Sequence, residues 1–145
     1  MVVAVVTPST LEALGLRYVL HVYFDAEVEI FGAAADLMEV RPERFDAYFV
    51  SPDVCLGCID FFLPRKAKVV VLCGDLAGNA MFMSLDAGMP EGDLVDAVDG
   101  CMARIGKNEL QAREELTPRE TDVLRCVARG CMNKEIADEL CISVN

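Results

Sequence analysis

The stretch Ala47-Tyr48-Phe49-Val50-Ser51-Pro52 contains four consecutive apolar residues that are closed by Ser51 and Pro52. A short apolar run that ends at a turn signal is typical of a strand that is buried on both faces of a sheet. Similar runs stand at residues 2–6 and 69–73, and Val28-Glu29-Ile30-Phe31 is a further strand candidate. We therefore predict four strands.

The segments between these strands have apolar residues at helical spacing. The predicted helices cover residues 10–20, 33–40, 59–63, 77–87 and 93–105, and the first is expected to turn Leu11, Leu14, Val19 and Tyr18 inward. Strands that alternate with helices indicate an α/β fold with a doubly wound parallel sheet. Only residues 89–92 separate the last two predicted helices. We therefore expect a fifth strand to be reduced or missing.

The charge of the chain is acidic and unevenly distributed. The net charge of the 145 residues is −11, with −9 in residues 1–109 and −2 in residues 110–145. An acidic surface repels phosphate, so any contact with nucleic acid is expected in the C-terminal part. The apolar runs, such as the one at residues 69–73, are far shorter than the ~20 residues of a membrane span. No signal peptide precedes the first strand, so we expect a cytoplasmic protein without a membrane segment.

The C-terminal residues 116–145 have the layout of a helix-turn-helix. Thr117-Pro118-Arg119-Glu120 forms a capping box, and Gly130 is placed to end the first helix. A second, shorter helix is predicted from Asn133 to about Leu140, and Ser143 is placed to cap a third. Periodicity alone also allows an unspecified helical hairpin. The pattern divides the chain into a body at 1–105, a linker at 106–115 and this segment.

The segment closely resembles the DNA-binding domain of LuxR/NarL-type regulators, whose pattern reads L-T-x-R-E-x-x-V-L, A-x-G, N-K-E-I-A and L-x-I-S. The resemblance implies DNA binding as a homodimer on two half-sites, with Asn133 and Lys134 contacting the DNA backbone. A solvated lysine is the alternative for Lys134. Met132 departs from the family, which usually has Ser there as an N-cap. The family's base-reading helix would begin after Asn145, so we expect residues 1–145 alone not to bind DNA sequence-specifically.

The body resembles a response-regulator receiver domain whose chemistry has been replaced. By this resemblance, Thr7-Pro8 stands at the acidic pair that holds Mg²⁺, Ser51 at the phosphoacceptor aspartate and Cys73 at the Thr/Ser position. No Lys or Arg occurs from Val69 to Ala103 to supply the family's lysine. We therefore predict a phosphorylation-independent pseudo-receiver with no phosphoacceptor, no catalytic residue, no metal and no cofactor. The protein is not expected to be an enzyme.

Cys55 and Cys58 form a lone C-x-x-C among seven cysteines. Because this pattern by itself is a weak signal, ordinary buried thiols are the simplest interpretation. A redox pair, or a metal site with Cys73 as a third ligand, is the alternative. The only histidine, His21, has no assigned role.

The sequence thus leaves three hypotheses for function. The first is a LuxR/NarL-type transcription regulator within a two-component system, which acts as a homodimer. The second is a protein-interaction module that sequesters partners and does not bind DNA, and the third is a redox-responsive regulator that uses Cys55 and Cys58. For the homodimer we expect a surface within residues 69–105. It is reached either by pairing at strand 69–73, which becomes an unpaired edge if no fifth strand follows it, or by packing of the last two predicted helices of the body.

Overall fold

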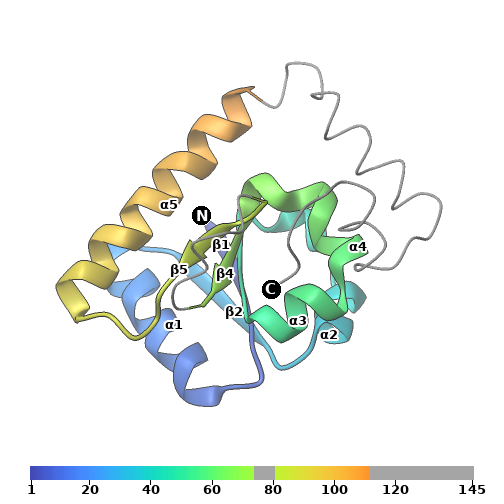
Figure 1. The fold of residues 1–145 in the computed structure, drawn as a ribbon, viewed down its shortest axis with the longest axis horizontal. Helices are drawn as coiled ribbons and strands as arrows, with labels where there is room; N and C mark the ends of the chain where they lie inside the picture. The colour runs from blue at the N-terminus through green and yellow to red at the C-terminus, as the bar shows by residue number, and fades with distance from the viewer. Residues whose placement is uncertain (74–80, 112–145) are drawn as a thin grey trace.

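A computed structural model describes residues 1–73 and 81–111 of the chain (Figure 1). In this part, strands alternate with helices and short 3₁₀ turns. The elements, in chain order, are β1 (Val2–Val6), α1 (Thr10–Phe24), β2 (Glu27–Phe31), α2 (Ala34–Glu39), η1 (Pro42–Arg44), β3 (Ala47–Val50), α3 (Pro52–Gly57), α4 (Ile59–Phe62), η2 (Leu63–Lys68), β4 (Val69–Leu72), β5 (Met83–Leu85) and α5 (Glu91–Gln111).

The strands form one parallel sheet in the order β2-β1-β3-β4-β5. The central strands β1, β3 and β4 are almost completely buried, which is why their sequences are continuous apolar runs. The predicted α/β fold with a doubly wound parallel sheet is confirmed. The fifth strand is present in the reduced form, with three residues.

The region after β4 differs from the sequence-based expectation. A helix was expected over 77–87, but the described residues 81–87 form a turn and β5, while 74–80 lie outside the described residues. Met83 and Leu85 are buried and Ser84 between them is exposed, so the period is two rather than 3.6. The apolar run was too short to separate the two periods.

This difference overturns the expected dimer contact through β4. Strand β5 pairs with β4 at Val70↔Met83 and Leu72↔Leu85, so β4 is not an edge. Val70 is fully buried and Met83 is 6% exposed, which leaves neither side chain accessible to a partner. A surface formed by pairing at the β4 edge is therefore wrong.

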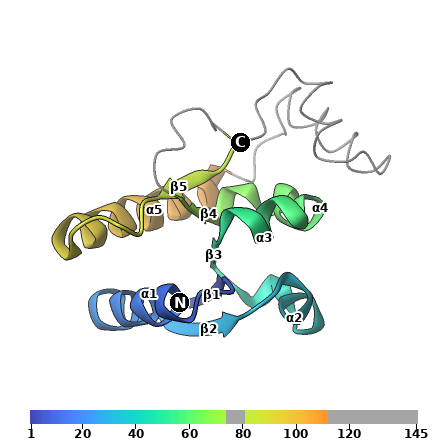
Figure 2. The same ribbon diagram turned by 60° about the horizontal axis from the view of Figure 1, so that its bottom comes forward.

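Helices cover both faces of the sheet and enclose two apolar cores. Figures 1 and 2 both show α1 and α5 on one side and α2, α3 and α4 on the other. On the α1 and α5 side, Val3, Phe49 and Val98 are central and fully buried. On the other side, Tyr48 and Phe62 are central. The sheet positions alternate between these two cores, as the pleat requires.

Helix α1 is oriented differently from the sequence-based expectation. Leu11, Leu14 and Tyr18 were expected to face the core, but they are exposed. Of the expected inward residues only Val19 is buried, and its companions are Ala13, Leu16 and Leu20. The helix has apolar residues on two opposite faces, so periodicity could not decide which face packs against the sheet.

Helix α5 continues beyond the point where a linker was expected. It runs without interruption to Gln111, so the first residues of the expected linker, 106–111, are helical. Its last turns are attached to η2: the Asn108 side chain donates to the Ala67 carbonyl at 3.5 Å, and Lys68 pairs with Glu109 at 2.9 Å. These contacts give the polar end of the helix a packing partner that periodicity does not reveal.

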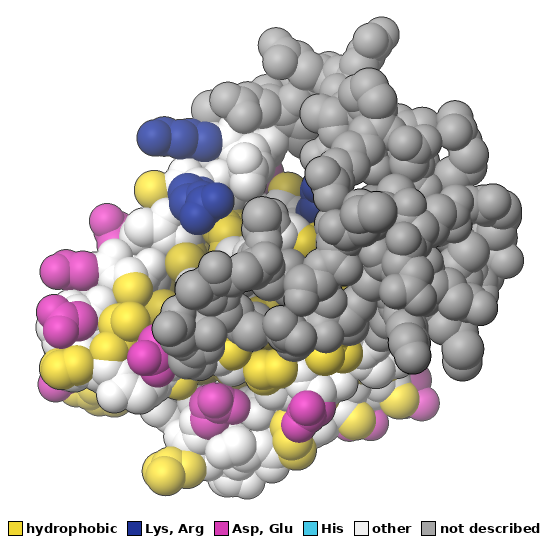
Figure 3. Space-filling model, viewed as in Figure 1, with side chains coloured by type: hydrophobic (Ala, Val, Ile, Leu, Met, Phe, Trp, Pro, Cys, Tyr) yellow, Lys and Arg dark blue, Asp and Glu magenta, His cyan; other side chains and the backbone are white. Residues whose placement is uncertain are grey.

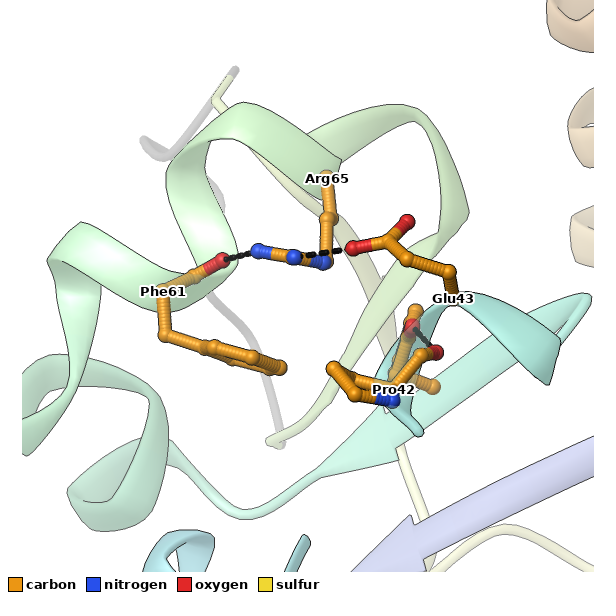
Figure 4. Close-up of polar contacts among 5 residues, drawn as sticks. Pro42, Glu43, Phe61 and Arg65 are labelled. Atoms are coloured by element: carbon orange, nitrogen blue, oxygen red, sulfur yellow. Dashed lines mark hydrogen bonds and ion pairs between the residues drawn. The ribbon is translucent and has the colours of Figure 1, made fainter. Parts of the chain in front are cut away.

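A cluster around Arg65 joins η2 to η1 on the α2 and α4 side (Figure 4). The guanidinium of Arg65 donates to the Phe61 carbonyl at 2.8 Å, pairs with Glu43, and lies over the Phe61 ring with its Cζ 4.2 Å from the ring centre. Nearby, the Tyr48 hydroxyl donates to the Pro42 carbonyl, and burial raises the pKa of Tyr48. The cluster uses both the charge and the planar face of arginine, as is typical of structural arginines.

Candidate functional site

The residues that replace the receiver chemistry lie together at the carboxyl edge of the sheet. Thr7 follows β1, Ser51 follows β3 and Cys73 follows β4, and these strands are neighbours. The Ser51 amide donates to the Val6 carbonyl at 3.0 Å, and the Cys73 amide donates to the Leu85 carbonyl at 2.9 Å. In a parallel α/β sheet this edge is the usual place for a ligand or a reaction centre.

Thr7 holds the start of α1. Its hydroxyl donates to the Glu12 carboxylate at 2.6 Å and accepts the Ser9 amide at 3.2 Å, while the Ser9 hydroxyl accepts the Glu12 amide at 3.4 Å. Ser9 is the N-cap and Glu12 lies three residues later, which is the spacing of a capping box. The position of the family's acidic pair is therefore occupied by a helix-capping network. The spacing Ser9-x-x-Glu12 was the sequence signal for it.

Ser51 is buried, and its hydroxyl is not paired with any group in the described part of the chain. The residue is 8% exposed, and its Oγ has no hydrogen-bond partner there. Its carbonyl accepts the Cys55 amide at 2.9 Å, so the backbone of Ser51 begins helix α3. Asp53 is exposed in the first turn of that helix rather than in β3, so it does not take the place of an aspartate at Ser51.

Cys73 lies close enough to Asp86 for their charges to interact. Burial and the carboxylate of Asp86 both raise the pKa of the Cys73 thiol. Asp86 follows β5, the strand after which the family has its lysine. The carboxyl edge therefore has a carboxylate where the resemblance to receivers implies a lysine. Sequence reasoning missed Asp86, because the strand before it was expected to be helical.

In the cysteine pair, Cys55 has the properties of a buried thiol, whereas Cys58 is partly exposed. Burial raises the pKa of Cys55 to about 12, with further contributions from Cys58 and Cys73 in the same direction. A reactive sensor thiol needs a lowered pKa and access to solvent, whereas Cys55 is 2% exposed. Among the described residues no group of three or more His, Cys, Asp or Glu side chains is placed to hold a metal ion. These observations support the interpretation of Cys55 as a packing residue.

The predicted DNA-contacting residues, Asn133 and Lys134, lie outside the described residues. In the part of the chain that the structure does describe, none of the helices combines the length and apolar character needed to cross a membrane.

Comparisons with known proteins agree with this architecture. Residues 114–145 match the family described as bacterial regulatory proteins, luxR family. The response regulator StyR is 26% identical, with a TM-score of 0.55 over 99% of this chain and 84% of that chain. RcsB from Salmonella enterica serovar Typhimurium, in a complex with the promoter rprA and the phosphomimetic BeF₃⁻, is 18% identical, with a TM-score of 0.55 over 99% and 85%.

A response regulator receiver protein from Pseudoalteromonas atlantica has a similar fold. It is 12% identical, with a TM-score of 0.55 over 71% of this chain and 98% of its own. A search of curated proteins found no match. The chain therefore has a fold similar to that of response regulators, with a C-terminal segment that matches the luxR family of bacterial regulatory proteins.

Proposed function

We propose that the protein is a cytoplasmic, phosphorylation-independent transcription regulator of the LuxR/NarL type, which binds DNA as a homodimer and is not an enzyme. The observation that carries this proposal is the match of residues 114–145 to the luxR family. The charge distribution agrees with it, because residues 110–145 have a net charge of −2 whereas residues 1–109 have a net charge of −9.

The carboxyl edge of the sheet supports independence from phosphorylation. A serine hydroxyl cannot form the acyl phosphate that an aspartate forms, and Ser51 stands at the end of β3. Thr7 uses its hydroxyl to hold the start of α1, and the described residues offer no cluster of carboxylates there to bind Mg²⁺. The body would then act through its shape and its assembly.

DNA binding is tested with the full-length gene product. The protein is mixed with a random pool of duplexes, and the duplexes that it binds are selected. We expect an enriched sequence with two half-sites, as a symmetric dimer requires. Lys134→Ala should weaken binding to all sequences about equally and reduce the salt slope by about 1, because a phosphate contact is lost.

The matched control is Lys107→Ala, which removes an exposed lysine from α5 outside the luxR-like segment. It should leave DNA affinity unchanged. If no sequence is enriched, or if the two lysine variants behave alike, the DNA-binding proposal is wrong and the protein-interaction hypothesis is favoured.

A further inference from the structure

Helix α1 has a second apolar face that the described part of the chain does not cover. Leu11 is 83% exposed, Leu14 51%, Tyr18 57% and Val22 54%. Their spacing of three, four and four residues places them along one side of the helix. We call these four residues the outer stripe. The stripe lies opposite the face that is buried against the sheet.

Such a stripe is not what a solvated helix presents. A helix that is apolar on all sides is normally buried, and exposed apolar residues on monomers are usually scattered singly. Helix α5, in the same layer, provides the comparison. Its solvent side has acidic residues at 93, 96 and 99 and basic residues at 104 and 107, and Figure 3 shows both groups along this helix. Thus the solvent side of α5 has the charged residues of a water-exposed helix, whereas the outer stripe of α1 has the apolar residues of a helix that packs against a partner.

A hollow of about 680 Å³ lies beside the stripe, between α1 and the start of β2. Leu14, Tyr18 and Val22 of the stripe form part of its lining, together with Val28. The lining of the hollow includes one basic residue, Arg17, and two acidic residues, Asp25 and Glu27. Leu11, the most exposed member of the stripe, is 11 residues from Val22, or about 16 Å along the helix axis.

We propose that the outer stripe is the homodimer surface, with α1 of one copy packed antiparallel against α1 of a second copy. A protruding Leu11 near one end and a hollow near the other suit this arrangement, because a two-fold axis would bring each Leu11 to the partner's Val22 and its hollow. The same pairing sets Gly15 opposite Tyr18. A Cβ built on Gly15 would meet nothing within 4 Å, so there is space for the partner's aromatic ring.

The path of the chain also favours a second copy over the chain's own C-terminal segment. That segment starts after Gln111, at the end of α5 that is attached to η2 beside β4. Helix α1 instead packs on β1 and β2, and β2 is the opposite edge of the sheet. Figure 2 shows α1 away from this end of α5. The proposal rests on the homodimer of the proposed function but not on its DNA binding.

The proposal is tested by sedimentation equilibrium of the 145-residue chain, whose protomer mass is 15.8 kDa. We expect a dimer whose Kd rises by about a hundredfold with Leu11→Lys or with Val22→Glu, because each change buries an unpaired charge in the interface. In the double variant the new lysine and glutamate face each other across an antiparallel pair, so dimerisation should return. The control is Met38→Lys, which changes a 43% exposed residue of α2 on the other layer and should leave the dimer intact.

Circular dichroism checks that each variant is folded; Leu11 is mostly exposed, so its replacement should not affect folding. A wild-type chain that is monomeric at all concentrations would overturn the proposal, and so would a dimer that neither single substitution weakens. Failure of the double variant to dimerise would overturn the antiparallel pairing. Enrichment of a DNA sequence is measured separately, so the two proposals can fail independently.

Discussion

At the scale of single residues, the carboxyl edge of the sheet holds structural contacts at the positions that the resemblance to receivers assigns to the reaction. Thr7 caps a helix through Glu12 and Ser9, and the backbone of Ser51 starts another helix. Asp86 brings negative charge beside Cys73. Thr7 and Ser51 stand at positions where the resemblance to receivers implies carboxylates that hold a metal. The fold of the edge and its chemistry are therefore separable.

The raised pKa of Cys55 predicts a loss of stability in alkali. The thiol stays protonated in the folded chain up to about pH 12, whereas in the unfolded chain it ionises near its ordinary value of 9.0. The stabilising contribution is therefore complete below pH 9 and is lost as the pH rises from 9 towards 12. Between about pH 8 and about pH 10 the free energy of unfolding should fall by about 1 kcal/mol more for the wild type than for Cys55→Val.

Urea unfolding at the two pH values measures this difference. Cys73 and Cys101 also have raised pKa values, but both are present in the two proteins, so their effect cancels. Equal pH dependence of wild type and variant would mean that Cys55 is accessible to solvent, and the redox hypothesis would regain support.

At the scale of elements, the two faces of α1 have different roles: the inner face packs in the core, and the outer stripe is the proposed dimer surface. Leu16 is 3% exposed and faces the core, whereas Leu14 belongs to the outer stripe. In the Leu11→Lys background, which is expected to be monomeric, Leu16→Ala should lower the free energy of unfolding by about 2–4 kcal/mol through loss of buried surface and formation of a cavity. Leu14→Ala should change it by less than about 0.5 kcal/mol.

Chemical unfolding measures the free energy of unfolding of both alanine variants in that background. Both variants replace Leu by Ala, so the two losses of stability can be compared directly. If the two substitutions cost the same, the inner and outer faces of α1 have been assigned wrongly. A larger cost at Leu14 than at Leu16 would restore the orientation expected from periodicity.

At the scale of the whole molecule, the body should not respond to phosphorylation signals. Acetyl phosphate with Mg²⁺, or beryllofluoride, should change neither the intact mass nor the sedimentation of the chain, because Ser51 is no acceptor and the edge offers no cluster of metal ligands in its described part. Mass spectrometry before and after treatment checks the first point. Added mass that hydroxylamine removes would identify an acyl phosphate and an acceptor carboxylate elsewhere.

The sequence alone determined the buried strands β1, β3 and β4, the α/β class and the residues at the ends of these strands. This was possible because strands that are buried on both faces have sequences of consecutive apolar residues, such as Ala47–Val50. The luxR-like pattern from Leu116 onward could also be recognised from sequence, because it consists of many residue types in a fixed register. The family match to residues 114–145 agrees with it.

Only the tertiary structure decided which face of α1 meets the sheet, whether β4 is an edge, and that α5 continues past residue 105. Each of these depends on a partner that is distant in the chain. The two faces of α1 are similarly apolar, so it is the packing against the sheet that buries Leu16 and leaves Leu14 exposed. The short β5 is recognised by its pairing with β4, and the extension of α5 over residues 106–111 by its contacts with η2. Periodicity reports what a segment can bury, whereas the packed fold determines what it does bury.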